Sequence, residues 1–149
     1  MFITISYKFL IIMIEFSIEK KIDCDPRKVW DIVKDLSSFT KYWHGTRELN
    51  LREVEKNVYE GELRFAFPAK GRVKISILEN DRKVIINYLK GPFIGTMSIT
   101  VYDDKIVSTW RVEMKGIYKL FEKWNEKHFK EGTIHALERI EQTLQIREY

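Results

Sequence analysis

The stretch IDCDPRKVWD at residues 22–31 carries the start signal of a helix. The Asp25 carboxylate can accept a hydrogen bond from a free backbone amide of the first turn, and Pro26 follows at the first helical position, where its missing N–H costs nothing. The apolar residues that follow form one narrow face: Val29, Trp30, Val33 and Leu36. We expect this helix to run from Pro26 to about Ser37.

The segments on either side of this helix have different periods. Residues 14–22 alternate between apolar and polar side chains, which predicts a strand with one buried face. On the other side, Phe39, Tyr42 and Trp43 form a short aromatic segment that ends at Gly45. This segment is expected to be a second short helix that leads into a sheet.

The region from Thr46 to Lys115 shows no helical period, and its alternating segments are separated by turn residues at nearly regular intervals. Because the loops are short, neighbouring strands are expected to pair as antiparallel hairpins. Six strands are predicted: Arg47–Val54, Val58–Phe67, Arg72–Leu78, Lys83–Leu89, Ile94–Tyr102 and Ile106–Met114.

A long helix is predicted from Gly116 to about Ile146, and its apolar stripe changes face part of the way along. The first stripe, expected to face the sheet, contains Ile117, Phe121, Trp124 and His128. The second stripe contains Phe129, Thr133, Ala136, Ile140 and Leu144. The change falls at Gly132, and glycine lowers helix stability by about 1 kcal/mol relative to alanine. We therefore expect a bend, or a close approach to the sheet, at Gly132.

Length and composition favour one folded domain. The chain has 149 residues, of which 44% are hydrophobic and 32% charged, as in soluble proteins with one core. A net charge of +4 without a basic run argues against a nucleic-acid partner. Cys24 is the only cysteine, which excludes an intramolecular disulfide and suits the cytoplasm. Residues 1–12, interrupted by Lys8 and too short to span a bilayer, are expected to be an extension to a domain at 13–149.

This order of elements, with the Pro-x-x-Val-Trp pattern at residues 26–30, resembles the START-related helix-grip superfamily over about residues 13–145. The superfamily includes polyketide cyclases, coenzyme-Q-binding proteins and the G-type subunit of carbon-monoxide dehydrogenase. The resemblance implies an α+β helix-grip fold, with a curved seven-stranded antiparallel sheet, two short helices after strand 1 and one long C-terminal helix. It also implies a cavity for an apolar molecule between the sheet and the long helix.

Alternation along the strands, together with the first helical stripe, gives the candidate ligand-binding residues. These are Leu63, Phe65, Ile75, Ile86, Tyr88, Met97, Ile99, Trp110, Val112, Phe121, Trp124 and His128. Inward-facing residues of this kind either line a cavity or simply fill a core, and alternation does not distinguish the two.

The segment that precedes the second strand contains three candidates for a cavity gate: Tyr42, Trp43 and His44. The alternative is that the two aromatic side chains close the end of the core. No cofactor is expected. No metal site is expected either, because His128 and His135 on the long helix lie two turns, about 10 Å, apart. Cys24 likewise lacks a neighbouring histidine in sequence that would indicate a nucleophile.

Three functions remain open. The first is binding or carriage of a small apolar ligand such as a lipid, quinone or polyketide-like molecule. The second is a cyclase, dehydrase or hydrolase acting in the same cavity, although no convincing acid–base pair is apparent. The third is an assembly or maturation factor like the G-type subunit of carbon-monoxide dehydrogenase. Stable membrane insertion is not expected, but a row of lysines at 119, 123, 127 and 130 is either an ordinary solvated face or weakly attracted to anionic membranes.

Overall fold

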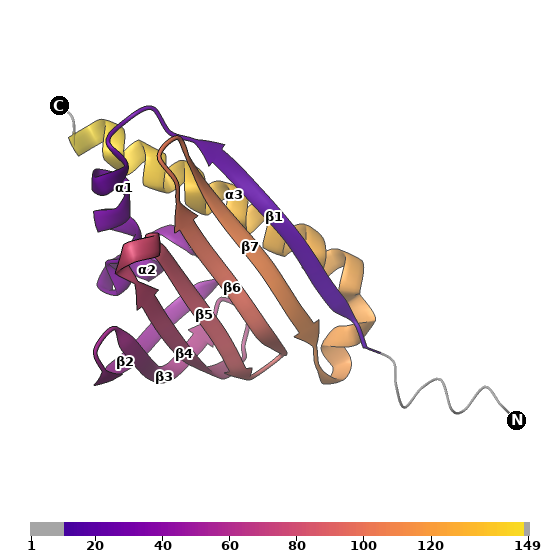
Figure 1. The fold of residues 1–149 in the computed structure, drawn as a ribbon. Coiled ribbons are helices and arrows are strands. Elements are labelled where there is room, and N and C mark those ends of the chain that lie inside the picture. Colours follow the sequence, from indigo (N-terminus) through magenta and orange to yellow (C-terminus); the bar gives the residue numbers. More distant parts are fainter. Residues whose placement is uncertain (1–10, 148–149) are drawn as a thin grey trace, which may run out of the picture.

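The computed structural model describes residues 11–147, which form one antiparallel sheet and a set of helices on one of its faces (Figure 1). The seven strands lie in the order β1-β7-β6-β5-β4-β3-β2, so the first strand pairs with the last. Their bounds are β1 Met13–Lys21, β2 Thr46–Glu55, β3 Val58–Phe65, β4 Lys70–Leu78, β5 Lys83–Lys90, β6 Phe93–Val101 and β7 Lys105–Met114. The predicted helix-grip architecture is confirmed.

Alternating side chains build the core on the inner face of this sheet. In β5, Val84, Ile86 and Tyr88 are buried, whereas the residues between them are partly exposed. Ile86 stands between Ile75 of β4 and Met97 of β6. The inner face is therefore mainly apolar, as the period of two requires, with Ser108 of β7 as a buried polar exception.

The helical elements are α1 (Pro26–Val33), η2 (Leu36–Ser38), α2 (Phe39–Tyr42), η3 (Glu79–Asp81), η4 (Gly116–Phe121) and α3 (Glu122–Arg147). Helix α1 begins as expected, because an Asp25 carboxylate oxygen accepts the Arg27 amide at 2.9 Å. It ends at Val33 and not near Ser37. Asp35 accepts the Ser37 amide at 3.2 Å and so starts the separate short helix η2.

The long C-terminal helix crosses one face of the sheet (Figure 1). The segment after Gly116 first forms the 3-10 helix η4, so the α-helical part begins at Glu122, later than predicted. Helix α3 then continues without interruption through Gly132. Apart from the adjacent backbone of the helix, a Cβ added there would have no atom within 4 Å, and the residue is exposed. The expected close approach of Gly132 to the sheet is therefore wrong.

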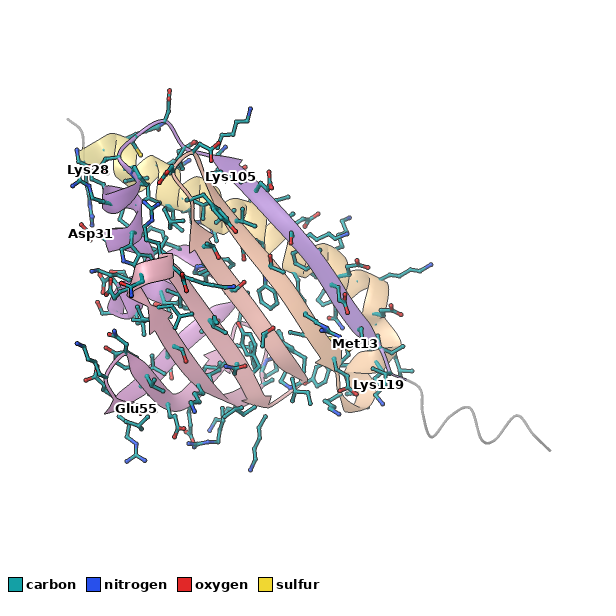
Figure 2. The ribbon with its side chains drawn as sticks, viewed as in Figure 1. Met13, Lys28, Asp31, Glu55, Lys105 and Lys119 are labelled. Atoms are coloured by element: carbon teal, nitrogen blue, oxygen red, sulfur yellow. The ribbon has the colours of Figure 1, made fainter. Side chains whose placement is uncertain are left out.

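Charged side chains lie around the periphery of the domain, among them the labelled Lys28, Asp31, Glu55 and Lys105 (Figure 2). None of the helices within residues 11–147 is both long and apolar enough to cross a membrane. Of the predicted N-terminal extension, residues 1–10 lie outside the described part of the chain, and the carbonyl of Ile12 accepts a hydrogen bond from the Met114 amide at 2.9 Å.

Candidate functional site

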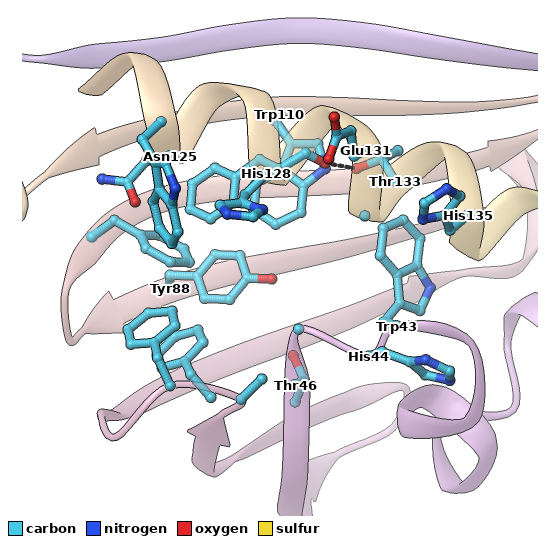
Figure 3. A pocket seen from close by; sticks show the side chains of 18 of the residues that line it. Trp43, His44, Thr46, Tyr88, Trp110, Asn125, His128, Glu131, Thr133 and His135 are labelled. Carbon is cyan, nitrogen blue, oxygen red and sulfur yellow. Dashed lines mark hydrogen bonds between the residues drawn. The ribbon is translucent and has the colours of Figure 1, made fainter. Parts of the chain in front are cut away.

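A pocket of about 540 Å³ lies between α3 and the sheet (Figure 3). Its volume falls within the range of about 300–1,000 Å³ typical of small-molecule sites. Three parts of the chain supply its wall. They are the sheet side with Phe65, Tyr88, Phe93 and Trp110; the α3 side with Trp124, Asn125, His128, Phe129, Glu131, Gly132, Thr133 and His135; and the rim with Phe39, Trp43, His44, Gly45, Thr46, Ala66 and Phe67.

Stacked aromatic rings form the inner wall of this pocket. The Trp110 ring stacks on Tyr88 at a centroid distance of 5.9 Å and on Phe129 at 5.0 Å. Phe93 meets Tyr88 edge-on at 4.8 Å. Such contacts hold flat apolar rings in fixed orientations. The inner wall is therefore an ordered apolar surface.

Two polar groups interrupt the apolar wall. The Tyr88 hydroxyl points into the open space of the pocket (Figure 3). Burial raises the pKa of Tyr88 above its ordinary value, so the phenol stays neutral at physiological pH. The indole Nε1 of Trp110 is buried and has no hydrogen-bond partner among residues 11–147. Of these two groups, only the neutral Tyr88 hydroxyl faces the open space, because the Trp110 Nε1 is enclosed by the surrounding side chains.

Three polar side chains of the α3 wall, Asn125, His128 and Thr133, make contacts within the protein. The Thr133 hydroxyl donates to the Phe129 carbonyl at 2.7 Å, and the Asn125 amide nitrogen donates to the Tyr118 carbonyl at 3.0 Å. His128 lies edge-on to Trp124 with a centroid distance of 3.8 Å. These contacts fix the helix side of the pocket and leave the histidine at its exposed rim.

The structure brings together some of the residues that the sequence indicated. Phe65, Tyr88, Trp110, Trp124 and His128 all line the pocket, with Trp43 and His44 of the expected gate. His44 Nε2 lies 3.0 Å from the Lys41 carbonyl oxygen. The roles of these residues in ligand binding and in gating remain predictions.

The remaining candidates lie elsewhere. Six are buried in the core without lining the pocket: Leu63, Ile75, Ile86, Met97, Ile99 and Val112. Tyr42 is buried, and its carbonyl accepts a hydrogen bond from Arg139 at 2.9 Å. Phe121 is exposed on η4, outside the pocket. Alternation identifies the inner face of a sheet, but it does not show which part of that face packs against other side chains and which part borders open space.

Sequence reasoning missed Phe93, which is buried and lines the pocket. The predicted strand began at Ile94, one residue too late to include Phe93. Met97 and Ile99 face inward, and the same period of two, followed back along the strand, places residue 93 on the inner face as well. Phe67 was missed for another reason. The predicted strand ran through it, but β3 ends at Phe65, and the Phe67 ring stacks on Phe65 at 5.3 Å beside the pocket opening.

Within residues 11–147, no group of three or more His, Cys, Asp or Glu side chains is placed to hold a metal ion. The titratable side chains of the pocket wall other than Tyr88 are His44, His128, Glu131 and His135, all exposed. Proton-transferring groups are thus at the opening, and the interior is aromatic.

Comparison with known proteins shows that this architecture is shared. The family model described as "Polyketide cyclase / dehydrase and lipid transport" matches residues 13–145. No curated protein matches the sequence. The protein TTHA0849 from Thermus thermophilus is similar in structure with a TM-score of 0.77 and 16% identity, over 91% of this chain and 99% of that one.

Two further structures show the same fold at low identity. The ZhuI aromatase/cyclase from Streptomyces sp. R1128 has a TM-score of 0.71 and 11% identity, covering 92% of this chain and 96% of that chain. A STAR-related lipid transfer protein from Xanthomonas axonopodis has a TM-score of 0.59 and 10% identity, covering 85% of each chain. At these identities the likeness is one of fold.

Proposed function

Because the chain belongs to the polyketide cyclase/dehydrase and lipid transport family, we propose that it binds and carries a small apolar ligand in the pocket between α3 and the sheet. The observation that carries this proposal is the open volume of about 540 Å³ beside stacked aromatic rings. A core that served only stability would leave no open volume of this size beside the rings, because protein interiors are close-packed.

The chemistry of the pocket interior indicates which class of ligand it would accept. The rings of Tyr88, Phe93 and Trp110 favour a flat or flexible apolar body. The neutral Tyr88 hydroxyl can donate a hydrogen bond to one oxygen of that body. A ligand with a fixed charge would lose its hydration without a compensating ion pair in this interior.

We favour carriage over catalysis because of where the titratable groups lie. A general base needs a pKa near the working pH and must reach the reacting atom. Tyr88, the titratable group of the interior, has a raised pKa and is a poor base at neutral pH. His128, Glu131 and His135 stand at the exposed side of the pocket. Turnover of a bound ketone by the unmodified protein would overturn this preference.

The test uses Gly132, because a side chain added there extends into open space along the pocket wall. We expect Gly132→Phe to weaken binding of a neutral fluorescent probe, N-phenyl-1-naphthylamine, by more than about tenfold, since the ring would occupy the ligand volume. Stability should be unchanged or higher, because glycine within a helix costs about 1 kcal/mol relative to alanine. Probe titration and thermal unfolding measure the two effects.

Gly132→Ala is the matched control, because it gives a similar gain in helix stability with little added volume. It should retain probe binding. Native mass spectrometry of the unmodified protein should show a co-purifying apolar molecule that Gly132→Phe loses. Equal probe binding by both variants and the unmodified protein would show that this pocket is not the binding site.

A further inference from the structure

Four large apolar side chains stand out from the protein surface where η4 joins α3. Ile117 is 70% exposed, Leu120 79%, Phe121 56% and Trp124 59%; we call these four residues the apolar patch. Their spacing of three, one and three places them in one stripe along the helical surface. Exposed apolar side chains gathered in this way mark an interaction surface.

The apolar patch is held in an ordered scaffold. The buried Asn125 on the first turns of α3 donates a hydrogen bond to the Tyr118 carbonyl at 3.0 Å and so ties η4 to α3. The Tyr118 ring packs against Phe67 at a centroid distance of 5.9 Å. These contacts use the inner side of η4, and the apolar patch is therefore directed outward.

Cations border the apolar patch on the same helical segment. Lys123 and Lys127 are exposed, lie one turn apart and form no ion pair with any of residues 11–147. The neighbouring Lys130 pairs with Glu126 at 3.3 Å. Lysines outnumber glutamates five to two over residues 115–130. The surface around the apolar patch is therefore positively charged.

A second group of cations lies beside Phe67, which contacts η4 through Tyr118. Arg47, Arg64 and Lys70 line a groove of about 440 Å³ together with Phe67 and Pro68. The turn between β3 and β4 thus places another aromatic ring near cations, of which Arg64 pairs with Glu48 at 4.0 Å. Exposed apolar side chains with cations nearby are therefore found on η4 and the start of α3, and also on the turn between β3 and β4. These two regions meet where Tyr118 packs against Phe67.

This combination of exposed rings and unpaired lysines selects one kind of partner. A symmetric dimer would cover the apolar patch, but each copy would add its own Lys123 and Lys127 to the interface and so increase the positive charge there. An anionic bilayer satisfies both parts of the surface, since apolar side chains enter the boundary of the acyl chains and lysines attract lipid phosphates. Tryptophan is also enriched at that boundary.

We infer that the protein docks on the surface of anionic lipid membranes through the apolar patch and the lysines beside it. This is peripheral binding, consistent with helices that are too short or too polar to cross a bilayer within residues 11–147. The docking does not depend on whether the pocket holds a ligand.

Trp124 connects the docking surface to the pocket, because it belongs to the apolar patch and also lines the pocket. A docked molecule therefore has its pocket opening at the membrane surface. If the proposed carriage is correct, an apolar ligand passes between the bilayer and the aromatic wall without crossing bulk water, where its exposed surface would be unfavourable.

The experiment is flotation of the full chain with vesicles of phosphatidylcholine alone and vesicles that also contain phosphatidylglycerol. We expect binding to the anionic vesicles, weakened by salt, and little binding to the neutral ones. Leu120→Glu should reduce binding by about tenfold or more, because it places a charge among the inserted side chains. Reversal of both bordering lysines, Lys123→Glu with Lys127→Glu, should reduce binding by more than about tenfold.

Matched controls come from exposed positions away from the apolar patch. Ile146→Glu changes an exposed isoleucine near the other end of α3, and Lys28→Glu changes an exposed lysine on α1. Both should bind anionic vesicles nearly as well as the unmodified protein. Leu120→Glu should still bind N-phenyl-1-naphthylamine, which separates failure of docking from failure of the pocket.

Three results would overturn the inference. The first is absence of binding to anionic vesicles at low salt, and the second is unchanged vesicle binding by Leu120→Glu. The third is a stable dimer of the full chain in sedimentation that Leu120→Glu converts to a monomer, which would assign the apolar patch to a second copy.

Discussion

The two halves of the C-terminal helical segment carry similar apolar patterns and use them in opposite ways. In the half around η4, Leu120 and Trp124 are exposed, whereas in the half after Gly132, Leu137 and Ile140 are buried. Helices α1 and α2 lie beside the second half, where Arg139 donates a hydrogen bond to the Tyr42 carbonyl, whereas the η4 end lies away from both helices (Figure 1). An apolar stripe therefore shows that one face of a helix favours burial. The arrangement of the neighbouring elements decides whether that face is buried within the same protein.

Gly132 lies where the two halves meet, and its role differs from the one its sequence position predicts. The expected close approach to the sheet is absent, since α3 is continuous and, apart from the adjacent backbone of the helix, no atom lies within 4 Å of a Cβ placed there. It lines the pocket instead. The absent side chain leaves open space beside the aromatic wall.

The strongest test of this comparison is truncation of Leu137, which is fully buried in the core. Leu137→Ala should lower the free energy of unfolding by about 2–5 kcal/mol, through lost apolar burial and the cavity it leaves. Urea denaturation followed by circular dichroism gives the value. A loss below about 1 kcal/mol would mean that the C-terminal half of α3 contributes little to the core.

An intermediate effect is expected at the junction of the two halves. Asn125→Ala removes the hydrogen bond to the Tyr118 carbonyl and leaves that acceptor without its partner, which should cost about 1–3 kcal/mol. Hydrogen exchange should show faster opening of η4 than in the unmodified protein, while the sheet keeps its protection. Uniform loss of protection through the whole domain would contradict the view that Asn125 acts locally on η4.

The smallest effect is expected from the same leucine truncation in the exposed half. Leu120→Ala should change the free energy of unfolding by less than about 0.5 kcal/mol, because the side chain is already in contact with solvent. Measured beside Leu137→Ala under the same conditions, it isolates the effect of burial from that of residue type. A cost above about 1 kcal/mol would show that another part of the chain covers Leu120.

Much of the fold follows from local signals in the sequence. The Asp25 and Pro26 pair marks the start of α1, and the period of two marks every strand, because both depend on backbone chemistry and on neighbours close in sequence. The end of α1 was harder to predict. Asp35 competes with continuation of the helix, and an apolar periodicity does not reveal that competition.

The site was only partly predictable for a different reason. Tyr88 and Met97 are both inward-facing and buried, yet only Tyr88 lines the pocket. Whether space remains above a residue depends on the volumes of side chains from several elements, and periodicity contains no information on volume. The same limitation applies to Trp124, which was expected to face the sheet and is more than half exposed.

The pairing of β1 with β7 has a consequence for how the protein is made. Ser17 and Thr109 hydrogen-bond across these strands although they lie 92 residues apart in the chain. At a synthesis rate of about 5–20 residues per second, β1 leaves the ribosome roughly 5 to 18 s before its partner strand. The hairpins from β2 to β7 can form in order as they emerge, whereas β1 must wait with Ile14 and Phe16 unpaired. Closure of the sheet by β1 is thus a late, long-range step that sets the time during which the nascent chain is open to aggregation.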